Sequence, residues 1–272
     1  MAKDCSRSTK HVLQVDATTC ITAMPDTSPA PVLILIHGAT GNGRMWDAVR
    51  RHLGTRWAVI APDLPGHAAR RDEPFTLAAA VETVAAAVRS VAPRPVVLAG
   101  DSLGGYTALA AAAAVPAGQL RGLVLAGCTA NMTGSALRQL VRRQWLIGGL
   151  AALLGEQRLS RLVAKDLKRA GLSEADVAAQ VEAGFNHRVF PQAVAALRGV
   201  DFRPRLAAIT QPVLIVNGGK DRLFVDQEAS FVAVARRATV HRFDGCEHGV
   251  SLRRPEAFAR LVDGFMAGLG EA

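Results

Sequence analysis

The stretch Pro95–Gly105 reads PVVLAGDSLGG and governs the interpretation of the rest of the chain. An apolar run leads into Gly100–Gly104 (GDSLG), and an alanine-rich segment follows. This order predicts a buried strand, a sharp turn and a helix, with Ser102 at the turn. Only small residues fit two places either side of such a serine, whose hydroxyl is exposed at the edge of the sheet. The stretch therefore indicates a nucleophilic serine.

On both sides of this stretch, apolar runs bounded by glycine or proline alternate with helical patterns. The predicted strands are His11–Val15, Thr19–Met24, Val32–His37, Trp57–Ala61, Pro95–Gly100, Leu120–Gly127, Val213–Asn217 and Thr239–Phe243. The predicted helices among them are Arg44–Leu53, Thr76–Val91, Leu103–Val115, Asp226–Arg236 and Pro255–Leu269. Continuously apolar runs suit strands that are buried on both faces of a parallel sheet. We predict an α/β protein with a mostly parallel sheet of eight strands flanked by helices.

The alternation breaks between residues 132 and 211, where only helical patterns such as Ser135–Leu154, Ser160–Ala170 and Glu174–Gly184 occur. We predict a core domain of residues 1–131 and 212–272, into which residues 132–211 are inserted as a helical cap. We also expect the apolar run Trp145–Leu154 to cover a hydrophobic acyl pocket. His187 within the insertion either lines this pocket or is a solvated residue at a helix end.

The predicted cap is strongly basic, with twelve Lys/Arg against six Asp/Glu, and holds much of the chain's net charge of +9. Two interpretations stay open. The cap presents an ordinary solvated basic surface, or it attracts an anionic substrate, an acidic acyl carrier protein or a coenzyme A thioester. Only five of the 32 basic residues are lysine, and no basic block occurs, so we predict no nucleic-acid partner.

The 272 residues, half of them apolar, suffice for one large α/β domain or a core domain with an insertion. The first twenty residues lack the apolar run of a signal peptide, and the longest apolar run is too short to span a bilayer. We expect a cytoplasmic protein without a membrane span. Cys5, Cys20, Cys128 and Cys246 show no paired spacing, so we expect reduced thiols and no metal site, with a Cys5–Cys20 bridge as the alternative.

A serine hydroxyl becomes a nucleophile when a histidine takes its proton and a carboxylate orients the histidine. Asp221 follows a predicted strand and a Gly-Gly turn, and His248 lies in the loop after the last predicted strand. Because the carboxyl ends of parallel strands meet at one edge, we expect both residues to lie near Ser102. Among the other carboxylates, Asp226 is expected to cap a helix and Glu247 to point away from His248.

The stretch Ile36–Trp46, IHGATGNGRMW, is a glycine-rich loop behind a predicted buried strand. A phosphate-binding P-loop needs lysine and then serine or threonine after its second glycine, where this chain has Arg44 and Met45. A dinucleotide-binding fold needs an acidic residue about 20 residues further on, and none stands there. We therefore expect no nucleotide cofactor.

With these motifs in this order, the chain resembles the α/β-hydrolase superfamily. The matching stretches span roughly residues 31 to 250 and include HGA at 37–39, DLPGH at 63–67, GDSLGG at 100–105 and GCEHG at 245–249. The resemblance implies an α/β-hydrolase fold, a triad of Ser102, Asp221 and His248 in that chain order, and an oxyanion hole formed by the amides of Ala39 and Leu103. It also implies that the histidines at 37 and 67 are packed residues.

The expected reaction is hydrolysis of a carboxylic ester or thioester of a small, largely apolar acyl group through an acyl-enzyme. We expect no cofactor and no metal. Two other classes stay open: a triad-dependent enzyme without ester hydrolysis, such as a lyase, a C–C bond hydrolase or a cofactor-free peroxidase, and a slow-turnover binding protein of the same fold. The sequence does not select the natural substrate.

Overall fold

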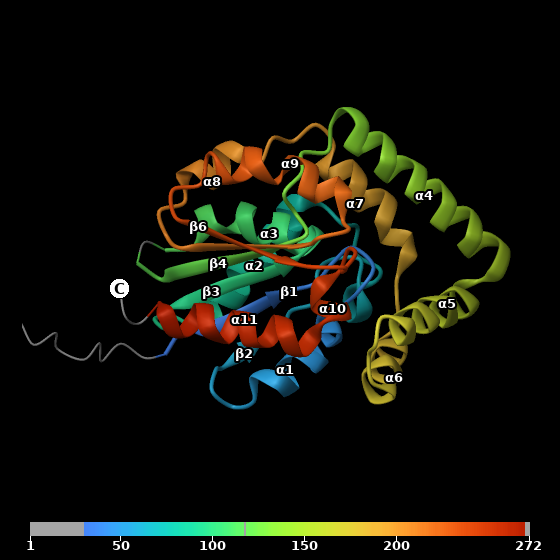
Figure 1. The fold of residues 1–272 in the computed structure, drawn as a ribbon, viewed down its shortest axis with the longest axis horizontal. Helices are drawn as coiled ribbons and strands as arrows, with labels where there is room; N and C mark the ends of the chain where they lie inside the picture. The colour runs from blue at the N-terminus through green and yellow to red at the C-terminus, as the bar shows by residue number, and fades with distance from the viewer. Residues whose placement is uncertain (1–29, 117, 270–272) are drawn as a thin grey trace, which may run out of the picture.

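The computed structural model describes residues 30–116 and 118–269, and its centre is one parallel β-sheet (Figure 1). The strands are β1 (Val32–Ile36), β2 (Val59–Ile60), β3 (Val96–Asp101), β4 (Leu120–Ala126), β5 (Val213–Gly218) and β6 (Ala238–Phe243). They lie in the order β2-β1-β3-β4-β5-β6, and every neighbouring pair is parallel. The described sheet thus has six strands rather than eight. The two remaining predicted strands, His11–Val15 and Thr19–Met24, lie outside the described residues.

The helices of the described chain connect these strands. They are α1 (Asp47–Leu53), α2 (Leu77–Ser90), α3 (Leu103–Ala111), α4 (Gly134–Leu154), α5 (Glu156–Arg169), α6 (Glu174–Ala183), α7 (Phe190–Leu197), α8 (Arg203–Ala208), α9 (Arg222–Val232), α10 (Val250–Arg253) and α11 (Pro255–Gly268). Short 3₁₀ turns are η1 (Gly43–Trp46), η2 (Ala68–Arg70), η3 (Ala112–Ala114) and η4 (His187–Val189).

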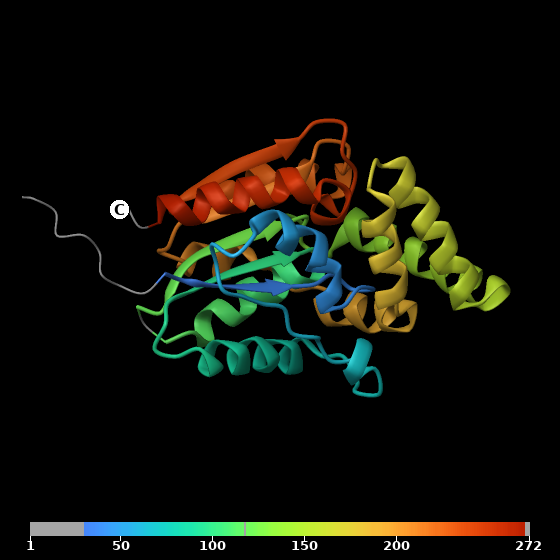
Figure 2. The ribbon, with the colours of Figure 1, turned by 90° about the horizontal axis from the view of Figure 1, so that it is seen from below.

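Helices cover both faces of the sheet (Figure 2). The paired helices α1 and α11 lie on one face, and α2, α3, α8 and α9 lie on the other. Side chains of β1 alternate between the two cores: Leu33 and Leu35 pack with Trp46 and Phe258, whereas Ile34 packs on the opposite side. All five residues of β1 are buried, as expected for a continuously apolar strand that is covered on both faces.

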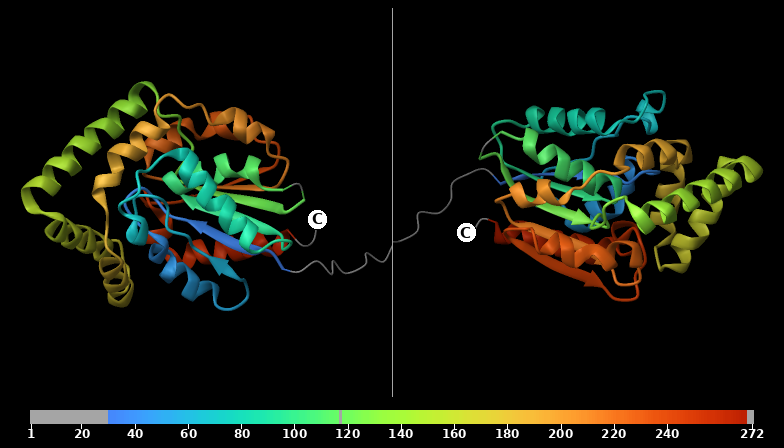
Figure 3. Two further views of the ribbon diagram at one scale, coloured as in Figure 1. Left: turned by 180° about the vertical axis from the view of Figure 1, so that it is seen from behind. Right: turned by 90° about the horizontal axis from the view of Figure 1, so that it is seen from above.

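Helices α4 to α7 follow β4 and extend beyond the carboxyl ends of the strands (Figure 3). Helix α4 contacts α5 and α7, and α6 contacts α1 and η1. Helix α8 differs from them, because it packs beside the sheet against α3 and α9. The part of the segment 132–211 that lies over the strand ends is therefore α4 to α7. None of the described helices is long and apolar enough to cross a membrane.

The apolar run Trp145–Leu154 forms the second half of α4, and its largest side chains face solvent. Trp145 is 74% exposed, Leu146 72% and Leu153 79%. The prediction that this run covers an acyl pocket is therefore wrong. The prediction fails because α4 runs outward from the core (Figure 1). The second half of this helix therefore has no core surface to pack against.

Candidate active site

Ser102 lies at the sharp turn between β3 and α3, where its backbone adopts φ 55° and ψ −115°. Few residues other than glycine adopt a positive φ, and such strain is typical of functional sites. A Cβ atom at Gly104 would lie 1.9 Å from the Ile36 carbonyl oxygen, and one at Gly100 would lie 2.2 Å from Gly104 backbone atoms. Both positions therefore require glycine, as the sequence pattern predicts.

The structure brings Ser102, His248 and Asp221 into one hydrogen-bonded chain. His248 Nδ1 lies 2.6 Å from Asp221 Oδ2, and His248 Nε2 lies 2.9 Å from Ser102 Oγ. The Asp221 side chain is 2% exposed and that of His248 33%, so the carboxylate is shielded from solvent while the imidazole lines the pocket. With the proton of the neutral ring on Nδ1, the serine hydroxyl donates to Nε2, which is the arrangement that activates a nucleophile.

Asp221 stands directly before α9, at the position where an aspartate commonly caps a helix. Its carboxylate makes no capping hydrogen bond and turns to His248 instead. The predicted helix start at Asp226 is therefore wrong, because α9 begins at Arg222. Asp226 lies one turn inside the helix and forms an ion pair with Arg222, with a distance of 3.0 Å.

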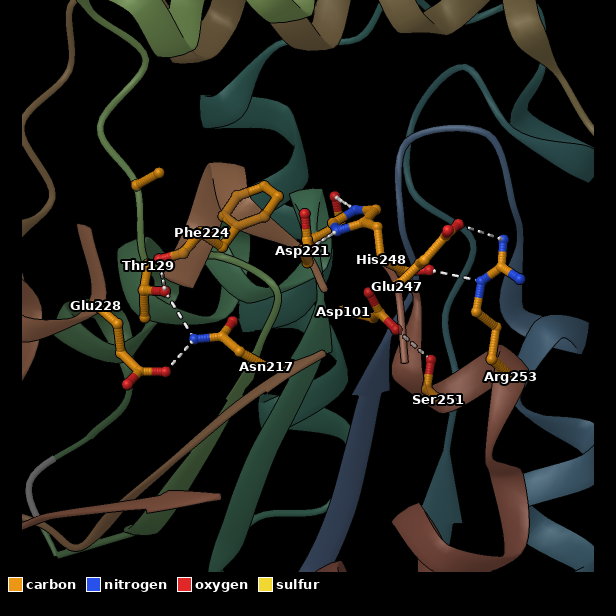
Figure 4. Close-up of polar contacts among 12 residues, drawn as sticks. Asp101, Thr129, Asn217, Asp221, Phe224, Glu228, Glu247, His248, Ser251 and Arg253 are labelled. Carbon is orange, nitrogen blue, oxygen red and sulfur yellow. Dashed lines mark hydrogen bonds and ion pairs between the residues drawn. The ribbon is translucent and has the colours of Figure 1, made fainter. Parts of the chain in front are cut away.

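A second carboxyl group, Asp101, is buried beside the triad; it lies within GDSLG, but the sequence pattern assigns it no role. It accepts a hydrogen bond from Ser251 on α10 and so connects the serine turn to the element behind His248 (Figure 4). Burial opposes the charged imidazolium. The hydrogen bond and charge of Asp221, together with the charge of Asp101, outweigh burial and raise the pKa of His248.

Two further residues hold the imidazole in place, and both follow a predicted residue closely in sequence. The ring of Phe224 stacks on that of His248, with centroids 4.9 Å apart and planes 15° apart. Arg253 donates from Nε to the His248 carbonyl oxygen at 2.9 Å. Glu247 lies toward Arg253, away from the His248 ring, in agreement with its expected direction (Figure 4).

Ala39 and Leu103 line the same pocket as Ser102 and His248. A Cβ atom at Gly38 would lie 3.7 Å from the Ser102 Cβ atom, so the glycine-rich loop packs directly on the serine turn. Within the described chain, neither the Ala39 amide nor the Leu103 amide donates a hydrogen bond to another group. Two amides at one pocket wall are available to an oxygen atom of a bound molecule.

Two buried histidines hold the peptide groups on either side of Ala39. His37 Nε2 accepts a hydrogen bond from the Leu64 amide, so its Nδ1 carries the proton and donates to the Gly38 carbonyl oxygen at 2.9 Å. Burial and the neighbouring His67 lower the pKa of His37 to about 3, which keeps the ring neutral. His67 Nε2 lies 2.9 Å from the Ala39 carbonyl oxygen. Both histidines are packed residues, as the resemblance implies.

The pocket at Ser102 is small and mostly apolar, with about 70 Å³ of free space. Besides Ala39, Ser102, Leu103 and His248, its wall consists of Tyr106, Met132, Leu140, Arg143, Phe190, Ala193, Val194, Leu197 and Phe224. Helices α4 and α7 thus supply much of its cover. His187 is buried against Phe185 and does not line this pocket, so neither expectation for it holds.

Comparison with known proteins agrees with the fold. A model of the alpha/beta hydrolase family matches residues 33–261. A pimeloyl-[acyl-carrier protein] methyl ester esterase of Methylococcus capsulatus is 30% identical over 87% of this chain and 95% of its own. Esterase Rv0045c of Mycobacterium tuberculosis is 30% identical over 90% of this chain and 86% of its own. A Nitrososphaera gargenis carboxylesterase structure is 20% identical, with a TM-score of 0.71, over 89% of this chain and 92% of its own.

A parallel sheet with a strained serine turn at its carboxyl edge is the architecture of a hydrolase. The chain belongs to the alpha/beta hydrolase family. The predicted fold class is thereby confirmed, and so is the prediction of an ester hydrolase, since the curated relatives are esterases.

Proposed function

We propose that the chain hydrolyses carboxylic esters of short, largely apolar acyl groups through an acyl-enzyme on Ser102. His248 takes the hydroxyl proton as Ser102 attacks the ester carbonyl, and then donates it to the leaving alcohol. Asp221 holds the imidazole tautomer, and the amides of Ala39 and Leu103 stabilise the negative oxygen of the tetrahedral intermediate. Water then attacks the acyl-enzyme by the same route and releases the acid.

The observation that carries this proposal is the hydrogen-bonded chain from Asp221 through His248 to Ser102. The apolar pocket beside it, with about 70 Å³ of free space, favours a short acyl chain over a long one. A neutral imidazole with a raised pKa is also a stronger base than a free histidine, which suits proton removal from the serine.

The test is steady-state hydrolysis of p-nitrophenyl esters of increasing acyl length. Ser102→Ala is expected to lower kcat by at least about three orders of magnitude, because the nucleophile is lost. Esters with short chains are expected to have the highest kcat/KM. Ester hydrolysis that survives unchanged in Ser102→Ala contradicts the proposal.

We also propose that an acidic carrier presents the natural substrate. Relatives are named for an ester attached to an acyl carrier protein, and the segment 132–211 carries twelve Lys/Arg against six Asp/Glu. Opposite charge speeds the encounter of two proteins. An ester bound to acyl carrier protein is expected to be hydrolysed with higher kcat/KM than the same ester free in solution, and added salt should reduce that advantage. Equal kcat/KM for both forms contradicts a carrier.

A further inference from the structure

Arg143 is the one residue with a permanent charge in the described wall of the Ser102 pocket. It lies one turn after Leu140 on α4, and both residues line the same pocket as Ser102. Apart from the triad residues, its neighbours in this wall are apolar side chains and Tyr106, whose hydroxyl donates to the Ala130 carbonyl oxygen. A guanidinium in such a wall offers several N–H donors to whatever occupies the pocket.

The guanidinium of Arg143 pairs with no carboxylate of the described chain. Helix α4 contains three arginines and no acidic residue, so it supplies no intrahelical partner. By contrast, Arg253, which donates to the His248 carbonyl oxygen, is paired with Asp166 at a distance of 2.5 Å. The N–H donors of the Arg143 guanidinium are thus available to a ligand.

The charge of Arg143 also reaches the proposed base. It counteracts part of the effect by which Asp221 and Asp101 raise the pKa of His248. An anion bound to Arg143 offsets this positive charge, so the imidazole regains basicity when such a ligand is present. Occupation of the pocket by an anionic substrate therefore favours proton removal from Ser102.

We propose that Arg143 is a carboxylate subsite of the Ser102 pocket, so that the preferred substrates are esters that carry a carboxylate a short alkyl chain away from the ester group. This inference rests on the proposed function. A guanidinium binds a carboxylate through two parallel hydrogen bonds, which gives orientation as well as affinity. The apolar walls of the pocket that Arg143 and Ser102 share suit a connecting chain of a few methylene groups.

The test uses two matched ester pairs, in each of which a carboxylate takes the place of a terminal methyl group. Monomethyl glutarate against methyl pentanoate places the carboxylate in the acyl part, and O-acetylglycolate against ethyl acetate places it in the alcohol part. For at least one pair, the wild-type chain is expected to have a higher kcat/KM with the anionic member. In Arg143→Gln, the ratio of anionic to neutral kcat/KM for that pair is expected to fall at least tenfold.

Arg142→Gln is the matched control, since Arg142 stands next in sequence on the same helix and is exposed like Arg143, but does not line the pocket. Its ratio is expected to stay within about twofold of the wild-type ratio, because only the general charge of α4 changes. Equal falls in both variants assign the effect to general charge and overturn the subsite. An unchanged ratio in Arg143→Gln, or a wild-type preference for both neutral esters, also overturns it. Failure to hydrolyse any of the four esters contradicts the proposed function instead.

Discussion

At the scale of single residues, the pKa of His248 decides the pH dependence of the reaction. The imidazole must be neutral to accept the Ser102 proton, and its pKa is raised above the usual 6.5. The value of kcat/KM for a neutral ester is therefore expected to rise through an apparent pKa above 6.5 and then level off, and to be lost as the pH falls. Measuring kcat/KM between about pH 5 and pH 9 gives this apparent pKa and the acid limb of the profile, where activity is lost.

Asp101→Asn tests the second carboxylate near His248. The amide keeps an acceptor for Ser251 but removes the negative charge that helps to raise the pKa of His248. Asp221 and Arg143, the other charged groups that act on the ring, are unchanged. The acid limb of the profile is expected to move to lower pH, and a shift to higher pH would contradict this role of Asp101.

His67→Ala removes the ring nitrogens that face the carbonyl oxygens of Ala39 and Pro65, each at 2.9 Å. The loop before the proposed oxyanion hole loses an anchor, so kcat is expected to fall about tenfold or more while KM changes little. His67→Gln retains an N–H donor and is expected to recover part of kcat. Steady-state kinetics check this prediction. A change in KM alone, or equal loss in both variants, contradicts a positioning role.

At the scale of elements, the serine turn depends on the close approach of α3 to β1. In Gly104→Ala the new Cβ atom meets the Ile36 carbonyl oxygen, so the free energy of unfolding is expected to fall by about 1–3 kcal/mol. Gly148→Ala on α4 is the matched control, because no atom lies within 4 Å of its Cβ position. It is expected to be neutral or slightly stabilising. Urea unfolding followed by circular dichroism measures both, and equal stability of the two variants contradicts the packing argument.

The elements also differ in how well the sequence predicts them. Strands such as β3 and β5 are predicted to within a residue or two, because their apolar runs are bounded by glycine or proline. The start of α9 is mispredicted because Asp221, at the N-cap position, makes no capping hydrogen bond. Its carboxylate bonds His248 instead, which is a tertiary contact. The apolar half of α4 is misjudged because hydrophobicity does not reveal which neighbour a helix has.

The residues of the candidate site also divide into those that local sequence patterns predict and those whose roles depend on tertiary contacts. Ser102, Asp221 and His248 stand at the carboxyl ends of strands within recognisable local patterns, so their convergence is predictable from topology. Ser251 and Phe224 carry no such pattern, since their roles depend on how α10 and α9 pack around the imidazole. Arg143 reaches the pocket only through the path of α4, a long helix that the sequence places in the insertion and not at the site.

At the scale of the whole molecule, the net charge of +9 is concentrated in the segment 132–211 near the pocket. Long-range attraction of this kind is screened by salt. Raising the ionic strength from about 0.05 M to 0.5 M is expected to lower kcat/KM for an anionic ester several-fold and to leave a neutral ester nearly unaffected. Parallel salt titrations of the two esters measure this, and identical responses contradict electrostatic steering.

Covalent labelling with diisopropyl fluorophosphate, followed by peptide mass spectrometry, tests the nucleophile most directly. We expect one adduct per chain, located on Ser102, with loss of ester hydrolysis in proportion to labelling. Labelling is expected to be absent in Ser102→Ala and slowed at least about a hundredfold in His248→Ala, because the hydroxyl then lacks its base. An adduct on a different residue, or full ester hydrolysis by a chain labelled on Ser102, would contradict Ser102 as the nucleophile.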